Sequence, residues 1–477
     1  MLFRVVDVSR SVSNTGLLDT TFKYESILRS EFANLVSPRK KRPLPRSVWI
    51  LSFVSFLADI SGEMMYPLLP LFLIGVLGSS KTQLGAMEGV AILIVSLMSA
   101  YAGIRSDRKG KGGGRVRWIR IGYGLPVLGK AIVALATVFS MVVFGRILDR
   151  FGKGLRGAPR DALIADAVSE EQRGRAFGLH RALDTAGALV GVLLAAFLLW
   201  WLTDSPRFDS SAGVSTKNVE TPAWVYRAIF GFSSVLGLAS LALTFFVHDA
   251  PAVASETQHD SPVMNGEAES PSPTPTSLAR KKSGWFHLPG SYWAVLGVLI
   301  LFSLANSSDT FLLLRARDLG YSSWSIVLVY ALFNVTYSAL SYPLGVLSDR
   351  IGRWRIIATG WSIYAASYVG FALLPNAYAW GMWPLMAFYG VYMALTDGIN
   401  KALIADHAPK EHRGAAMGLF YALTGVTTLI ASLMTGVVWD LIGPAPAMLL
   451  GAAFAILALS ALVILGQFVE LEKASVA

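Results

Sequence analysis

Long apolar segments alternate with short polar connections along most of this chain. Twelve such segments recur, and roughly 20 apolar residues cross a ~30 Å hydrocarbon layer as a helix. The pattern therefore predicts twelve membrane-spanning helices, six in each half of the chain. We place them at 48–77, 84–105, 117–139, 141–166, 174–201, 224–247, 291–314, 323–347, 355–374, 381–406, 414–438 and 444–467.

An internal repeat divides these helices into two halves. Residues 160–183 (RDALIADAVSEEQRGRAFGLHRAL) match residues 400–423 (NKALIADHAPKEHRGAAMGLFYAL) at 13 of 24 positions. GIRSDRKG, from Gly103, likewise matches GVLSDRIG, from Gly345. Repeats offset by half the chain indicate two homologous six-helix units. The expected organisation is an N-terminal tail 1–47, a first bundle 48–248, a flexible central loop 249–289, a second bundle 290–468 and a C-terminal tail 469–477.

Composition supports an integral membrane protein. Apolar residues make up 54% of the 477 and charged residues only 15%, whereas soluble domains are about a quarter charged. The net charge of +10 comes from basic residues in alternate connections, which predicts cytoplasmic termini in a bacterial inner membrane and no nucleic-acid partner. Cysteine is absent, which excludes disulfides and thiol chemistry. With no catalytic or metal motif, we expect no enzyme activity and no cofactor, and we expect a monomer.

The duplicated GxxSDRxG sequence is similar to the signature loop of the major facilitator superfamily. The resemblance covers roughly residues 48–467. It implies an all-α membrane protein with twelve transmembrane helices in two pseudo-symmetric bundles, and transport by alternating access. The run RxGKGxRxxPRDALIAD (150–166) further resembles a bacterial subgroup, which implies no particular substrate. The resemblance also implies gating roles for Gly103, Asp107, Arg108 and Gly110 and for Gly345, Asp349, Arg350 and Gly352.

The fourth predicted helix is unusually charged. Exposing Arg150, Lys153 and Arg156 to lipid would cost about 8–10 kcal/mol in total, so they must face a polar cavity or ion-pair partners. At helical spacing the charges from Arg146 to Asp161 fall within an arc of roughly 140°. Structural pairing, for example of Asp149 with Arg146 or Lys153, is the alternative to a cavity role. The glycines at 152, 154 and 157 predict close helix approach.

Other predicted helices carry polar residues as well. The resemblance implies that the first, fourth, seventh and tenth helices line a central cavity, and all four carry ionisable residues. A carboxyl that gains and loses a proton there is suited to proton coupling. The predicted substrate-binding residues are Arg150, Lys153, Arg156, Lys130, Asn306, Asp309 and Asp397, and the predicted proton-coupling residues are Asp59, Glu63, Arg146 and Asp184.

These features favour a proton-coupled secondary transporter of a small polar, anionic solute. One alternative is a proton-driven exporter of drugs or other toxic compounds, with a cation held by Asp59, Glu63 and Asp309. The fifth helix has DTAGALVG, without the glycine-proline pair of the exporter signature, and this argues against that alternative. A non-transporting sensor or scaffold on the same fold is a third possibility, which the two intact gate loops disfavour.

Overall fold

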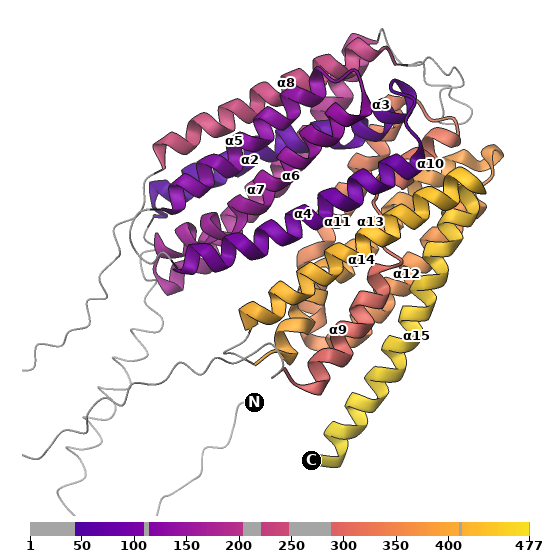
Figure 1. The fold of residues 1–477 in the computed structure, drawn as a ribbon. Helices are drawn as coiled ribbons and strands as arrows, with labels where there is room; N and C mark the ends of the chain where they lie inside the picture. The colour runs from indigo at the N-terminus through magenta and orange to yellow at the C-terminus, as the bar shows by residue number, and fades with distance from the viewer. Residues whose placement is uncertain (1–42, 109–113, 204–220, 248–287, 410–412, 477) are drawn as a thin grey trace, which may run out of the picture. The chain divides into compact units, whose positions relative to one another are not determined.

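The computed structural model describes residues 43–108, 114–203, 221–247, 288–409 and 413–476, and every regular element in these ranges is helical (Figure 1). The first half contains α2 (Arg46–Met65), η1 (Tyr66–Leu68), α3 (Leu69–Gly75), α4 (Lys81–Arg108), α5 (Arg115–Ala134), α6 (Phe139–Asp166), α7 (Glu170–Leu202), α8 (Ala223–Leu243) and η2 (Thr244–Phe246). The second half contains α9 (Gly290–Ser303), α10 (Thr310–Asp318), α11 (Ser323–Ile351), α12 (Arg353–Leu373), η4 (Asn376–Gly381), α13 (Met382–His407), α14 (Arg413–Leu441) and α15 (Pro444–Val476).

Helices occupy all twelve predicted places, and the all-α prediction is confirmed over the described residues. Eight segments are long and apolar enough to cross a membrane by length and composition. The other four places are taken by α5, α6, α13 and the broken pair α9–α10. Helix α9 is apolar but only 14 residues long, whereas α6 carries many charged residues, so a hydropathy criterion alone finds neither.

The seventh predicted helix is not continuous, so the expectation of one helix over 291–314 is wrong. Helix α9 ends at Ser303 and α10 begins at Thr310. Short polar side chains compete with the backbone hydrogen bonds of a helix and so favour an interruption. Here the hydroxyls of Ser308 and Thr310 hydrogen-bond to each other at 2.9 Å. The hydroxyl of Tyr364 donates to the freed carbonyl of Ala305 at 2.5 Å. The backbone carbonyl group freed at the break is thus hydrogen-bonded to another part of the protein, as the membrane interior requires.

Glycines hold α6 close to its neighbours. A Cβ at Gly152 would lie 2.4 Å from Cδ of Pro126 in α5, and one at Gly154 would lie 2.9 Å from the carbonyl oxygen of Val95 in α4. Close approach is therefore confirmed at these two positions. It is wrong for Gly157, whose Cβ position has nothing within 4 Å. With α4 and α5 packed this tightly, the charges of α6 are left to face the interior of the first bundle.

Two equivalent ion pairs reflect the internal repeat. Arg115 at the start of α5 pairs with Asp166 at the end of α6. Arg353 at the start of α12 pairs with Asp406 near the end of α13. Because Asp166 and Asp406 are matched positions of the repeat, the same tie occurs once in each half. We call the side of the bundle with these pairs, where α2 also begins, the basic side.

The two halves meet along α4 and α14, which lie side by side (Figure 1). A Cβ at Gly85 of α4 would lie 2.2 Å from the carbonyl oxygen of Ser432 in α14. At the end away from the basic side, Asp440 of α14 accepts hydrogen bonds from the amides of Lys81 and Thr82 at 3.1 and 2.8 Å and from the Thr82 hydroxyl at 2.7 Å. Asp440 therefore satisfies first-turn donors of a helix in the other half.

Replacing Gly85 with alanine tests this contact. The added methyl group overlaps backbone that cannot rotate away, so we expect a loss of about 1–3 kcal/mol in the free energy of unfolding, as for other overpacked sites. Gly297→Ala in α9 is the matched control, because its Cβ position is open. It should be neutral or more stable by up to about 1 kcal/mol, since alanine favours helix. Equal thermal unfolding of the two variants would contradict the close contact.

Candidate functional site: a central polar cluster

Charged side chains of several helices gather near the middle of the helix lengths. They come from α2, α4, α5, α6 and α7 in the first half and from the residue that precedes α10 in the second. Each interacts electrostatically with at least one other member, so the set is continuous across both halves. We call it the central polar cluster: Asp59, Glu63, Glu88, Lys130, Arg146, Asp149, Arg150, Lys153, Arg156, Asp184 and Asp309.

Arg146 forms a buried bidentate ion pair with Glu88 of α4. Its Nε and Nη2 donate to the two carboxylate oxygens at 3.0 Å each, and the two side chains are only 2% and 3% exposed. The guanidinium also lies over the ring of Tyr66, 5.6 Å from its centroid. Arg146, predicted for proton coupling, is therefore placed as a tie between α6 and α4. The sequence analysis missed Glu88, although a lone acid within an apolar helix was the available signal.

Two further cations of α6 also have carboxylate neighbours. Nη2 of Arg156 lies 3.6 Å from Asp59, and its guanidinium stacks on Tyr123 with 4.3 Å to the ring centroid. Nε of Arg150 lies 3.4 Å from Asp149. The pairing that the sequence left open as an alternative is thus present for these arginines. Acids supplied by α2 and α4 offset the excess of basic residues on α6.

The two lysines of the cluster have no ion-pair partner among the described residues. Lys130 is buried, and its Nζ donates to the hydroxyl of Ser61 at 2.6 Å. Lys153 is exposed, and no hydrogen bond or ion pair of its side chain is present in the described part of the chain. Its charged neighbours include Arg150 and Asp59. Lys153 is therefore the cation of the cluster most accessible to a ligand.

Four carboxyl groups of the cluster remain besides Glu88 and Asp149, which are in ion pairs with arginines. Asp59 of α2 and Asp184 of α7 are neighbours that interact with each other, and two adjacent carboxyl groups disfavour ionisation of both. Glu63 instead accepts from the hydroxyl of Tyr330 at 3.0 Å. Asp309 accepts from the hydroxyl of Tyr389 at 2.6 Å. Glu63 and Asp309 are thus each bound by a tyrosine of the second half.

An aromatic wall in the second half faces the break between α9 and α10. Phe302 stacks on Trp361 with 4.3 Å between ring centroids. The oxygen of Asn306, a predicted binding residue, is buried and has no hydrogen-bond partner among the described residues. The sequence analysis missed this wall, although tyrosines three or four residues apart on two helices were visible. Its tyrosines are Tyr330, Tyr364, Tyr368, Tyr389 and Tyr392.

A cavity of about 470 Å³ opens nearer the basic side. Asp397, a predicted binding residue, lines it together with Arg181 of the first half. Asp397 accepts from Lys401 at 2.8 Å and from Tyr337 at 3.0 Å. Asp397 therefore lies in a second site, which Arg181 connects to the central polar cluster through its contact with Asp184 at 3.6 Å.

Those predicted gate residues that the structure describes lie at the basic side. Gly345 lines the 470 Å³ cavity. Gly352 has a φ of +96° and separates α11 from α12, a conformation that favours glycine. Arg350 is exposed near the end of α11. Gly110 lies outside the described residues, as do the surroundings of Gly103 and the side chains of Asp107, Arg108 and Asp349.

A family model described as Major Facilitator Superfamily matches residues 51–432. The chain belongs to this superfamily. Its fold is the twelve-helix transporter fold of the family, and it is an integral membrane transporter and not an enzyme. The resemblance found in the repeated signature loops is therefore confirmed.

Relatives within the superfamily cover most of the chain. An uncharacterized MFS-type transporter of Methanocaldococcus jannaschii is 30% identical over 87% of this chain and 94% of its own length. The quinolone resistance protein NorA of Staphylococcus aureus is 22% identical over 84% and 92%. Among solved structures, the nucleoside transporter NupG has a TM-score of 0.65 at 12% identity over 88% and 99%. A D-xylose-proton symporter has 0.63 at 15% over 87% and 96%.

Breaking the Arg146–Glu88 pair should be strongly destabilising in this superfamily member. Glu88→Gln leaves the buried guanidinium of Arg146 with only its longer contact to Asp149 at 3.6 Å, so the expected loss is up to about 3–5 kcal/mol in the free energy of unfolding. Arg181→Gln is the control, because Arg181 pairs with Asp184 at 3.6 Å while its own side chain is 67% exposed. Such a pair contributes at most about 1 kcal/mol. In detergent, Glu88→Gln should unfold at a clearly lower temperature than Arg181→Gln. Similar melting temperatures would contradict a stabilising contact between α6 and α4 through the buried pair.

Proposed function

We propose that this protein carries a small polar, anionic solute across the membrane by alternating access, coupled to protons. The observation that carries the proposal is Lys153, an accessible ammonium group that forms no ion pair within 4 Å among the described residues. It is flanked on the same helix by Arg150 and Arg156. A carboxylate or phosphate bound there would gain charge-assisted hydrogen bonds from more than one of these cations.

The neighbouring carboxyl pair suggests how protons couple to the solute. Asp59 lies beside Asp184, so the two carboxyl groups are suited to hold a proton between them, and Asp59, when ionised, attracts Arg156 and Lys153. A bound anion competes with the Asp59 carboxylate for the same two cations. Full protonation of the pair removes this competitor, so proton and anion favour each other's binding. By linkage the coupling is reciprocal, as symport requires.

Contacts between the halves support a state that is closed away from the basic side. Asp440 ties α14 to α4, and Tyr330 of α11 donates to Glu63 of α2. The cavity with Arg181 lies nearer the basic side. We propose that the basic side is cytoplasmic in a bacterial inner membrane, with both termini there. The bundles 48–248 and 290–468 then rock against each other, and the loops of Asp107 and Asp349 act as gates.

Neutralising Lys153 should weaken binding of an anionic solute. In a thermal-shift screen of matched anionic and cationic metabolites, an anion that stabilises the wild-type protein should lose most of its effect in Lys153→Gln. The effect should also be lost in Arg150→Gln/Lys153→Gln. Arg46→Gln is the control, since it removes the same charge from the exposed start of α2. Stabilisation by anions that persists unchanged in Lys153→Gln would remove α6 as the binding element.

The affinity for that anion should depend on pH through Asp59. Because protonation of the Asp59–Asp184 pair frees the cations, the wild-type protein should bind an always-ionised carboxylate more tightly as the pH falls. Asp59→Asn imitates the protonated form and should bind tightly across the whole range, with the slope of affinity against pH greatly reduced. A wild-type slope retained in Asp59→Asn would assign the coupled proton to another group. Glu63→Gln, measured in parallel, then decides whether that group is Glu63.

An exporter of cationic drugs is the second candidate, and two observations favour it. Glu63 and Asp309 accept hydrogen bonds only from tyrosines and form no ion pair among the described residues. They lie beside the aromatic wall, which suits a lipophilic cation. The relative NorA is described by its name as a quinolone resistance protein. Stabilisation by cations that is lost in Asp309→Asn and unaffected by Lys153→Gln would favour export of cationic drugs over transport of an anion.

A further inference from the structure

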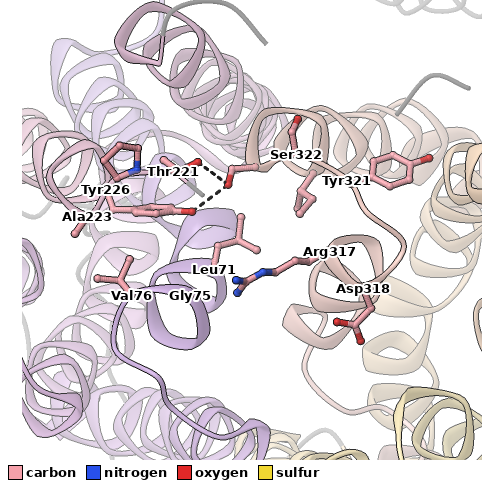
Figure 2. Close-up of a pocket in the computed structure, with 13 residues that line it drawn as sticks. Leu71, Gly75, Val76, Thr221, Ala223, Tyr226, Arg317, Asp318, Tyr321 and Ser322 are labelled. Carbon is pink, nitrogen blue, oxygen red and sulfur yellow. Dashed lines mark hydrogen bonds between the residues drawn. The ribbon is translucent and has the colours of Figure 1, made fainter. Parts of the chain in front are cut away.

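A separate pocket lies on the side of the bundle opposite the basic side (Figure 2). Its volume is about 480 Å³, and it forms where α3 ends, α8 begins and the α10–α11 connection passes. Arg317 lines it eight residues after Asp309, which corresponds to about 12 Å along a helix. No residue of the central polar cluster lines it. The pocket is therefore a different place from the proposed transport site.

Both halves of the protein build this pocket. Leu71 and Gly75 belong to α3 and Tyr226 to α8, whereas Arg317 and Ser323 belong to the second half. The hydroxyls of Thr221 and Tyr226 lie 2.9 and 3.0 Å from the hydroxyl of Ser323 and hydrogen-bond to it across the halves, as Figure 2 shows. A molecule in this space would touch α3 and α10 together.

Arg317 is the one cation among the described residues that line the pocket. Figure 2 shows its guanidinium directed toward Gly75, and Nη2 lies 3.0 Å from the position that a Cβ on Gly75 would take. Its Nη1 is buried and has no hydrogen-bond partner among the described residues. The adjacent Asp318 also lines the pocket, but its carboxylate interacts with Lys81 and Arg315 as well. The guanidinium therefore retains donors for another acceptor.

We propose that this pocket binds a small solute with a phosphate or carboxylate group, held by Arg317. A buried guanidinium N–H without an acceptor costs free energy that an oxyanion recovers. The hydroxyls of Thr221, Ser322 and Ser323 suit the remaining polar groups of a polyol. Because the walls come from both halves, the bound solute stabilises the arrangement in which they touch on this side. Occupation of the pocket therefore slows opening of that side.

Glycerol 3-phosphate is the probe, tested for thermal stabilisation of the full chain. We expect saturable stabilisation of the wild-type protein and at least a tenfold weaker apparent affinity in Arg317→Gln. Gly75→Leu, at an exposed position of the last turn of α3, fills the space beside the guanidinium and should have the same effect without removing the charge. Lys153→Gln should retain the stabilisation. An effect abolished by Lys153→Gln, or unchanged in both pocket variants, would overturn the proposal.

The phosphate can come from a free solute or from a lipid headgroup, and reconstitution separates the two. In nanodiscs of phosphatidylcholine alone, a free solute is indicated if glycerol 3-phosphate still stabilises the protein through Arg317. A lipid is indicated if phosphatidylglycerol nanodiscs stabilise the wild-type protein more than Arg317→Gln and added glycerol 3-phosphate changes nothing. The absence of an Arg317-dependent effect in both lipids would contradict an oxyanion site.

Discussion

The cost of placing charge inside a bilayer dominates the organisation of this protein. Helix α6 carries more cations across the membrane than its own acids can neutralise, and each unpaired one would cost several kcal/mol. The bidentate contact of Arg146 with Glu88 offsets part of that cost by burying a matched pair with both carboxylate oxygens satisfied. The glycine contacts of α6 keep its backbone close enough to α4 and α5 for such pairs to form. Pairing and close packing thus depend on each other.

The two halves share a fold but differ in the chemistry of their interiors. The first half supplies all the cations of the central polar cluster, from α5 and α6. The second half supplies Asp309 beside the break between α9 and α10 and an aromatic wall whose hydroxyls reach the carboxylates. Gene duplication preserved the ties at the basic side, as the pairs of Asp166 and Asp406 show. The residues at the centre, in contrast, differ between the two halves.

Much of the fold could be predicted from the sequence, because hydropathy and an internal repeat report directly on span number. The repeat also identified charged α6 as a spanning helix, since its partner α13 is more apolar. The break before Thr310 was not predicted, because the carbonyl group that it frees is hydrogen-bonded by Tyr364 of another helix. The sequence predicts a functional role for Arg146 but not its partner Glu88, because the spacing of residues within one helix does not identify contacts with a neighbouring helix. Distances between helices, which decide whether a charge is tied or available, required the structure.

The contact of Asp440 with the start of α4 bears on how readily the halves can separate. Its three hydrogen bonds lie at an exposed site, so water can replace each partner as the helices part. Exchange of a protein acceptor for a water molecule changes the free energy by only about 0.5–1.5 kcal/mol per bond. A contact between the halves that is closed by groups which water can solvate can open reversibly. A contact closed by a wide apolar surface would hold the protein in one state.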